Sequence, residues 1–336
     1  MADEPVSAPQ WLGRYVERID SRISGIFGEG DTSLDGVVKE ALSGGKRVRA
    51  VLALLWCEAI SGSYETALPL SVAYELAHAA ALVQDDIVDN SDLRRGERSI
   101  VNRYGLRAAI LASNLLLAQV PREIAEYGTH DPSGETLKKL FELLGESYGA
   151  SVMGEFMDLE MAERDDADEK QYESMIKLKT GALVGASSAS GVIVGGGLGN
   201  DELVRAAFNF GECLGMAYQV QDDLLDIVGD EKVLGKPVFS DIRSGKKNVV
   251  VIHTFEHCRD DDRRFLAKLL GSGGSIEESQ MKTAKELFAE YDSIDYARKV
   301  ALNYVERAQK ILHTLELGPS RSKLIELSEY LAERNY

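Results

Sequence analysis

The sequence is poor in proline and cysteine for its length. Only seven of its 336 residues are proline, and no Ser/Pro-rich segment or charge run divides it, so we expect one domain over residues 1–336, with residues 1–9 disordered. The three cysteines, Cys57, Cys213 and Cys258, stand singly in helix-like runs without paired spacing. This pattern predicts buried, reduced thiols and fits a cytoplasmic location.

Features of secreted, membrane and nucleic-acid-binding proteins are also missing. The first nine residues are polar and acidic, unlike a signal peptide. The longest weakly polar run, residues 181–199, is rich in Gly and Ser and too short for a membrane span. Basic residues are few, with 38 Lys and Arg against 55 Asp and Glu and a net charge of −17. We therefore expect a cytoplasmic protein that binds no nucleic acid and has no stable membrane insertion.

Alternating strand patterns are absent, and helical periodicity dominates the chain. The helices expected from the periodicity span residues 11–27, 46–60, 66–89, 99–120, 135–163, 168–194 and 201–226, followed by about four shorter ones. A polar turn at residues 90–97 and loops at 128–134 and 229–245 interrupt them, and Asp201 is the expected N-cap of its helix. With an apolar content of 44%, the prediction is an all-α bundle of ten or more helices.

Two nearly identical acidic heptapeptides each end an apolar, helix-compatible run. They are VQDDIVD at residues 83–89 and VQDDLLD at residues 220–226. Residues four apart share a helical face, so Asp85 lies beside Asp89, and Asp222 beside Asp226. Like charges at this spacing repel each other unless cations offset them. Because oxygen-only carboxylate sites suit Mg²⁺, the pair predicts a multi-metal site between two helices that binds a highly anionic substrate.

Basic residues stand near predicted helix ends, where they would complement such a substrate. Two glycines precede Lys46 and Arg49 at the start of a helix, and a glycine-lined helix N-terminus with added charge binds anions such as diphosphate. An ordinary glycine break with surface-reaching basic side chains is the alternative. Arg94 and Arg95 follow the first heptapeptide, and arginine matches phosphate oxygens bidentately. His78 lies two helical turns before Asp85, on the same face; the alternative is a buried core histidine.

Together these segments resemble the trans-isoprenyl diphosphate synthases. The resemblance rests on GGKRVR at residues 44–49, DDIVD with the RRG that follows it, Lys179-Thr180, and QDDLLD followed by GKP, in the family's order from about residue 44 to residue 246. It implies an isoprenoid synthase-like fold, which is a single large helical bundle around a central cavity, and a homodimer. It also implies a prenyltransferase of the geranylgeranyl or medium-chain type.

The resemblance further implies roles for individual residues, which we carry over by position. Mg²⁺, with three ions expected once diphosphate is bound, would be held by Asp85, Asp89 and Asp222, with support from Asp86, Asp223 and Asp226. The allylic diphosphate would lie among Arg94, Lys179, Thr180, Gln219, Lys236 and Lys246. Isopentenyl diphosphate would be bound by Lys46, Arg49, His78 and Arg95. Glu155 stands where the family often has Gln, a departure without an explanation from sequence.

The same resemblance suggests the length of the product. In the family, side chains one turn apart below the first acidic cluster limit the growing chain; here these are Ala81, Ala80, Ala77 and Tyr74. Alanines deepen the channel by a turn of about 5.4 Å each, so we expect a product of C20 or longer, in the geranylgeranyl to geranylfarnesyl or hexaprenyl range. Tyr74 is the candidate floor; alternatively, it is simply a core residue.

Other functions remain open from sequence. A farnesyl diphosphate synthase would share the motifs, although such enzymes generally carry aromatic residues where Ala80 and Ala77 stand. A class I terpene cyclase also has an Asp-rich site, but lacks the paired motif and needs no isopentenyl diphosphate site. A non-catalytic partner subunit of a heteromeric synthase tends to lose the acidic clusters or the RRG segment, and both are intact here. A structural ion-binding protein would leave the placed Lys and Arg unexplained.

Overall fold

The structure is a computed structural model that describes residues 8–27, 33–128, 134–229, 231, 237–273 and 276–332. The expected disorder of residues 1–9 falls largely on residues 1–7, which lie outside this described part, as do Lys236 and most of the loop at 128–134.

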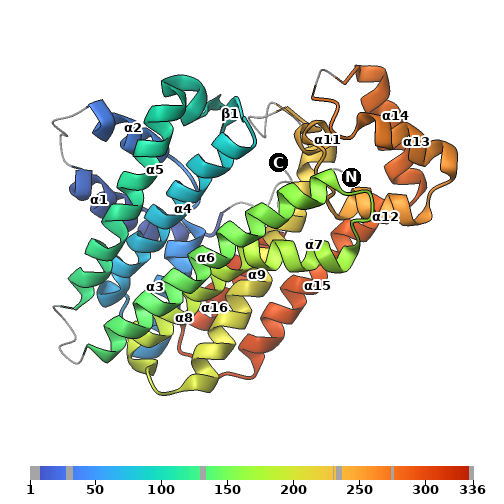
Figure 1. The fold of residues 1–336 in the computed structure, drawn as a ribbon. Helices are drawn as coiled ribbons and strands as arrows, with labels where there is room; N and C mark the ends of the chain where they lie inside the picture. Colours follow the sequence, from blue (N-terminus) through green and yellow to red (C-terminus); the bar gives the residue numbers. More distant parts are fainter. Residues whose placement is uncertain are drawn as a thin grey trace.

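The described chain is almost entirely helical (Figure 1). The first half comprises α1 (Leu12–Phe27), α2 (Ser33–Ala41), α3 (Val48–Ser61), η1 (Glu65–Ala67), α4 (Leu68–Val88), α5 (Ile100–Tyr127) and α6 (Glu135–Glu163). The second half comprises α7 (Glu169–Ile176), η2 (Lys177–Gly181), α8 (Ala182–Val192), η3 (Ile193–Gly197), α9 (Asp201–Val228), α11 (Ser240–Ser244), α12 (Val249–His257), α13 (Asp260–Leu269), α14 (Glu278–Glu290), α15 (Ser293–His313) and α16 (Ser320–Ala332). The predicted all-α class is confirmed.

Three local elements and one helix cap differ from the sequence prediction. The polar turn after α4 contains a small antiparallel hairpin, in which β1 (Leu93–Arg94) pairs with β2 (Glu97–Arg98). The short helix α11 lies within the expected loop at 229–245, and α2 was not predicted. Asn200, rather than Asp201, caps α9, because its side chain accepts a hydrogen bond from the backbone N–H of Leu203 at 3.1 Å.

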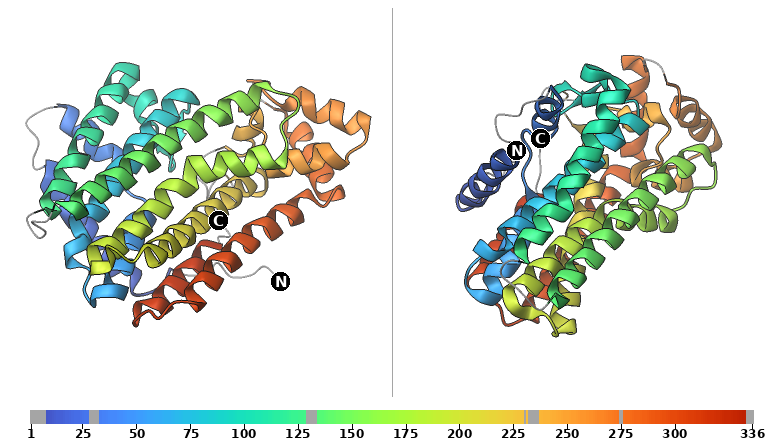
Figure 2. Two further views of the ribbon diagram at one scale, coloured as in Figure 1. Left: turned by 60° about the horizontal axis from the view of Figure 1, so that its bottom comes forward. Right: turned by 60° about the vertical axis from the view of Figure 1, so that its left-hand side comes forward.

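The long helices lie alongside one another, and the short helices α11 to α14 gather at one end of the bundle (Figure 1). Figure 2 shows the same arrangement from two further sides. Every residue of α8 is buried, and α8 packs against α3, α6 and α9, so it forms a central layer of the fold. The helices that end in the two heptapeptides, α4 and α9, thereby run through the interior, where their last turns reach a shared cavity.

The segment 65–88, which contains α4, is the one helix of the described chain that is long and apolar enough to cross a membrane. In its most apolar window 78% of the residues are buried inside the protein, and its side chains pack into the main hydrophobic core. Its apolar character is that of a core helix.

Candidate active site

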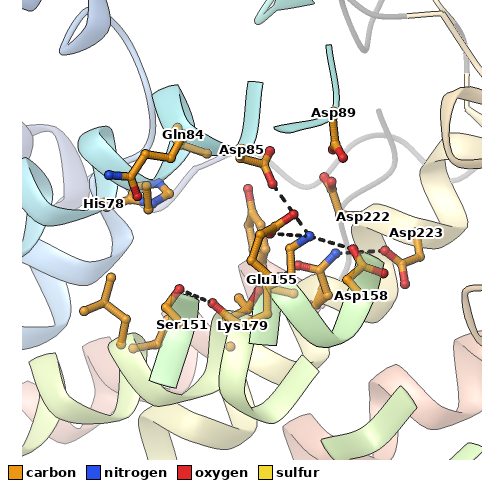
Figure 3. A pocket seen from close by; sticks show the side chains of 18 of the residues that line it. His78, Gln84, Asp85, Asp89, Ser151, Glu155, Asp158, Lys179, Asp222 and Asp223 are labelled. Atoms are coloured by element: carbon orange, nitrogen blue, oxygen red, sulfur yellow. Dashed lines mark hydrogen bonds and ion pairs between the residues drawn. The ribbon is translucent and has the colours of Figure 1, made fainter. Parts of the chain in front are cut away.

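A cavity of about 1050 Å³ lies between the last turns of α4 and α9, the middle of α6 and the start of α3. The side chains of the first heptapeptide face those of the second across it (Figure 3). Most of the predicted site residues line this cavity: Lys46, Arg49, His78, Ala81, Asp85, Asp89, Arg94, Arg95, Lys179, Thr180, Gln219, Asp222, Asp223 and Lys246. The structure therefore brings together residues that lie up to 200 positions apart in the sequence.

The first heptapeptide is surrounded by cations. Arg94, from the hairpin, donates to Asp85 Oδ2 at 2.7 Å and to Asp86 Oδ1 at 2.5 and 2.9 Å. Lys246 Nζ donates to Asp89 Oδ2 at 2.5 Å. Burial raises the pKa of Asp85, but Lys179, Arg94 and Lys246 outweigh that effect and hold it well below its usual range. Asp85 is thus kept ionised, whereas Asp86 does not line the cavity and serves to hold Arg94.

Lys179 lies at the centre of a carboxylate group that the sequence analysis only partly identified. Its Nζ lies 2.7 Å from Asp158 Oδ2, 2.7 Å from Glu155 Oε2 and 3.6 Å from Asp85 Oδ1. The helix α6 approaches η2 so closely that a Cβ on Gly154 would lie 2.2 Å from the backbone nitrogen of Lys179, so glycine is required there. Asp158 was missed; its position three residues after Glu155, on the same helical face, was the available signal.

Together with Asp85 and Asp89, Glu155 forms a group of carboxylates with the spacing of a cation site. One oxygen each from Asp85, Asp89 and Glu155 lie within 4.8 Å of one another. Burial, followed by the neighbouring charge of Asp85, raises the pKa of Glu155 to about 7. Its Oε1 is buried and makes no hydrogen bond with any described residue. An oxygen-only set with an orphaned oxygen fits Mg²⁺, and it includes two of the three metal ligands expected from sequence.

The aspartates of the second heptapeptide make different contacts from those of the first. Asp222 lines the cavity opposite Asp89 (Figure 3). Asp223 accepts hydrogen bonds from Tyr172 Oη at 2.6 Å and Gln219 Nε2 at 2.8 Å, and burial raises its pKa to about 7. Asp226 is fully buried outside the cavity wall and accepts from the backbone N–H groups of Ser240 and Asp241 at 3.2 and 3.1 Å. Its carboxylate therefore anchors the start of α11 rather than facing the cavity.

A second group of basic residues lines the cavity at the start of α3. Burial lowers the pKa of Arg49, whose Nε has no hydrogen-bond partner in the described chain. Burial and the nearby arginines hold the pKa of His78 well below its usual range, so its imidazole is neutral. Lys46 Nζ lies 5.1 Å from the ring centre of Tyr330 on α16. Arg95 donates to the Ser43 carbonyl at 2.6 Å. The positive charges of Lys46, Arg49 and Arg95 are thus concentrated where the diphosphate of isopentenyl diphosphate was expected.

The remaining predicted residues divide into two groups. Thr180 Oγ1 donates to Gln219 Oε1 at 2.7 Å, so these two cavity residues continue the hydrogen-bond chain from Asp223. Of the chain-length candidates, Ala81 lines the cavity, but Tyr74, Ala77 and Ala80 are fully buried and are not among its lining residues. Tyr74 Oη shares a hydrogen bond of 2.8 Å with Ser190 Oγ of α8, so its hydroxyl group links two core helices. A floor at Tyr74 stays a prediction.

Comparisons with known proteins agree with this geometry. Residues 31–288 match the family model of polyprenyl synthetases. The chain is 35% identical to the short chain isoprenyl diphosphate synthase of Methanothermobacter thermautotrophicus, covering 97% of this chain and 98% of that protein. It is 38% identical to the geranylgeranyl diphosphate synthase of Sulfolobus acidocaldarius, covering 87% and 86% of the two chains.

The fold is similar to that of solved structures as well. The crystal structure of geranylgeranyl pyrophosphate synthetase from Pyrococcus horikoshii superposes with a TM-score of 0.88 at 34% identity, covering 96% of this chain and 97% of that one. The family match covers well over half of the sequence, and the acidic and basic groups that define the cavity stand in the matched region. The chain therefore belongs to the polyprenyl synthetase family of prenyltransferases, which condense isopentenyl diphosphate with allylic diphosphates.

Proposed function

We propose that this protein elongates an allylic diphosphate with isopentenyl diphosphate to a linear trans-polyprenyl diphosphate of C20 or longer. The observation that carries the proposal is one cavity with two carboxylate clusters facing each other, a separate group of cations beside them and an apolar wall. The similarity to geranylgeranyl diphosphate synthases supports the length. We propose that the whole chain, residues 1–336, acts as a single domain, because both of its hydrophobic cores contribute residues of α9.

The first step is the departure of the allylic diphosphate. The C–O bond breaks, its electron pair leaves with the diphosphate, and an allylic cation remains. Lys179, Lys246 and Arg94 supply fixed positive charge where the leaving group gains negative charge. We propose that Asp85, Asp89 and Asp222 hold Mg²⁺, with three ions present once diphosphate is bound, and that Glu155 lies close enough to add a ligand. Bound Mg²⁺ supplies electrostatic stabilisation of the leaving group.

The second step is attack on the allylic cation. Lys46, Arg49, Arg95 and the neutral His78 hold the diphosphate of isopentenyl diphosphate. Its double bond then forms a C–C bond to the cationic carbon, and loss of a proton to the released diphosphate leaves a product five carbons longer. The apolar wall, which includes Leu82, Val152 and Leu183, keeps out water that would quench the cation.

We also propose a cytoplasmic homodimer. Large apolar side chains are exposed on α5 and α6, including Leu106, Leu111, Met153 and Phe156, each more than half exposed. These two helices pack against each other, and large apolar surfaces exposed on a single chain commonly mark protein–protein contacts. A second copy of the chain would bury them. Size-exclusion chromatography with light scattering tests this, and a monomer at assay concentration would contradict it.

Product analysis tests the proposed function. The purified protein is incubated with Mg²⁺, isopentenyl diphosphate and, separately, dimethylallyl, geranyl, farnesyl and geranylgeranyl diphosphates, and dephosphorylated products are sized by mass. A defined product of at least twenty carbons is expected. A fifteen-carbon product would indicate a farnesyl diphosphate synthase, and a cyclic hydrocarbon made without isopentenyl diphosphate would indicate a terpene cyclase. No turnover with any primer would indicate a non-catalytic partner subunit.

A further inference from the structure

Two adjacent lysines after α11 contact different parts of the protein. Lys246 lines the cavity, where its Nζ lies 2.5 Å from Asp89 Oδ2. Lys247 does not line the cavity and is only 7% exposed. Its Nζ donates hydrogen bonds to the backbone carbonyls of Met161 at 3.0 Å and Ala162 at 2.7 Å, in the last turn of α6. The two side chains therefore connect one short segment both to the cavity and to the end of α6.

The contact of Lys247 suits the C-terminal end of a helix. The last four carbonyl groups of an α-helix have no partner within the helix, and this end carries a partial negative charge. A lysine placed there hydrogen-bonds the carbonyls and interacts favourably with the helix dipole. The hydrogen bond to the Met161 carbonyl is buried, and breaking it would leave polar groups unsatisfied in the interior. Lys247 is thus firmly attached to α6.

The same helix carries a carboxylate of the cavity. Asp158 stands about one turn before the two carbonyls that Lys247 contacts, on the same side of α6. Its Oδ2 lies 2.7 Å from Lys179 Nζ and 3.6 Å from Lys246 Nζ. Figure 3 shows Asp158 and Lys179 side by side in the pocket. Lys247 therefore ties the segment that carries Lys246 to the helix that positions a carboxylate beside it.

Other contacts fix the two ends of this segment. The backbone N–H of Lys246 donates to the Asp241 carbonyl at 2.9 Å. Asn248 caps α12, because its side chain accepts a hydrogen bond from the Val251 N–H at 3.2 Å. The side chain of a lysine is a flexible four-carbon stem, so its ammonium group keeps one place only where its backbone is held. Among these contacts, that of Lys247 joins the segment to α6.

We propose that Lys247 is a positioning residue that acts on the reaction through Lys246. By holding the backbone of residues 246 and 247 against the end of α6, it keeps the ammonium group of Lys246 beside the departing diphosphate. This inference rests on the proposed function, in which Lys246 is one of the cations that stabilise the leaving group. Charges that are already in place stabilise a transition state without reorganisation, so a Lys246 on a loosened backbone contributes less.

The first test measures activity and diphosphate binding in Lys247→Met, which keeps most of the side-chain volume but has no charge and no donor. We expect kcat to fall by about 10- to 10²-fold, the scale of a misplacement of about 1 Å near the reacting groups. The Kd of inorganic diphosphate, measured by calorimetry with Mg²⁺, should rise. The KM for isopentenyl diphosphate should change little, because Lys46, Arg49 and Arg95 bind it. An unchanged kcat or an unchanged diphosphate affinity in the folded variant would overturn the inference.

A double-mutant cycle separates this role from a purely structural one. If Lys247 acts through Lys246, Lys247→Met should reduce kcat far less in a Lys246→Met background than in the otherwise unmutated protein. An equal loss in the two backgrounds would overturn the inference, because Lys247 would then act independently of Lys246.

Lys323→Met is the matched control. Lys323 also ties helices together, since its Nζ donates to Tyr15 Oη at 2.7 Å and to Glu58 Oε2 at 2.8 Å, and it does not line the cavity. This variant should lose stability in urea unfolding but keep its kcat and its diphosphate affinity. A fall in kcat as large as that of Lys247→Met would show that any loosened helix contact lowers activity, and would overturn the inference.

Two further provisions keep the test decisive. If circular dichroism shows that Lys247→Met is unfolded, Lys247→Gln replaces it, because glutamine is neutral and shorter but still polar. Binding of inorganic diphosphate needs no turnover, so it tests the role of Lys247 separately from the reaction. Absence of elongation by the unmutated protein with every primer would refute the proposed function itself.

Discussion

The two acidic heptapeptides differ at only two of seven positions, yet the protein uses them differently. In the copy at residues 83–89, cations from three other segments contact the carboxylates. In the copy at residues 220–226, Asp223 is hydrogen-bonded by Tyr172 and Gln219, and Asp226 anchors α11 from outside the cavity. Of the three aspartates of this copy, Asp222 and Asp223 line the cavity and Asp226 does not.

The comparison shows that a repeated motif fixes side-chain directions but not their surroundings. Both motifs end long core helices, α4 and α9. The segment after α4 returns Arg94 to the carboxylates, whereas the segment after α9 brings the backbone N–H groups of α11 to Asp226. The first copy is therefore expected to act mainly on the substrate, and the second to combine one binding residue with structural ones.

The largest expected effect is the loss of activity in Asp85→Asn. This carboxylate lies beside Asp89 and Glu155 in the group of residues proposed to bind Mg²⁺, so its replacement removes a metal ligand and weakens the stabilisation of the leaving diphosphate by the ion. We expect kcat to fall by about 10²- to 10³-fold, as for loss of one strong electrostatic contact. Steady-state kinetics measure the effect. A kcat within a factor of three of the unmutated protein would remove the distinction between the two copies.

A large loss of stability is expected in Asp226→Asn. The fully buried carboxylate accepts hydrogen bonds from two backbone N–H groups of α11. The asparagine side chain has an NH₂ group in place of one carboxylate oxygen, so a donor would face one of these N–H groups. Leaving such groups unsatisfied costs about 1–3 kcal/mol. Urea unfolding of Asp226→Asn and of Asp85→Asn measures the difference between their free energies of unfolding. A larger loss of stability in Asp85→Asn than in Asp226→Asn would contradict the anchoring role of Asp226.

A moderate effect is expected in Tyr172→Phe. The lost hydroxyl group donates to Asp223 at 2.6 Å, next to the cavity residue Asp222, and loss of such a supporting contact typically reduces metal affinity or activity about 10-fold or more. The Mg²⁺ dependence of the rate measures the change. Tyr304→Phe, which removes a similar hydroxyl group from a residue that does not line the cavity, is its control, and equal behaviour of the two variants would refute the role of Tyr172.

The smallest effect is a difference in pH dependence between the copies. The pKa of Asp223 is raised to about 7 by burial, so the folded protein binds its proton more tightly, and its contribution to stability is lost as pH rises from about 4 to 7. The pKa of Asp85 is depressed, so its contribution is present above pH 4 and is lost as pH falls. Metal-free Asp223→Asn should therefore lose less stability than the unmutated protein between pH 5 and 7. An equal change with pH in the free energy of unfolding of Asp223→Asn and of the unmutated protein would contradict this.

Much of this arrangement follows from the sequence because helical periodicity and motif spacing are local. The positions of α4 and α9, the facing of Asp85 and Asp89, and the basic start of α3 were all predictable. The contact of Lys179 with Asp158 was not, because it depends on the close approach of α6 and η2 at Gly154. The capping role of Asp226 depends on α11, whose five residues are too few to show a period. The hydrogen bond from Tyr148 to Gln84 was not predictable either, because these residues lie 64 positions apart in the sequence.

The most direct test of the difference between the two copies is a crystal structure with Mn²⁺ and diphosphate, read from the anomalous scattering of the metal. We predict ions bound by Asp85 and Asp89 on one side and by Asp222 on the other, with Asp226 still hydrogen-bonded to α11. An ion bound by Asp226, or a first heptapeptide without any ion, would contradict the account.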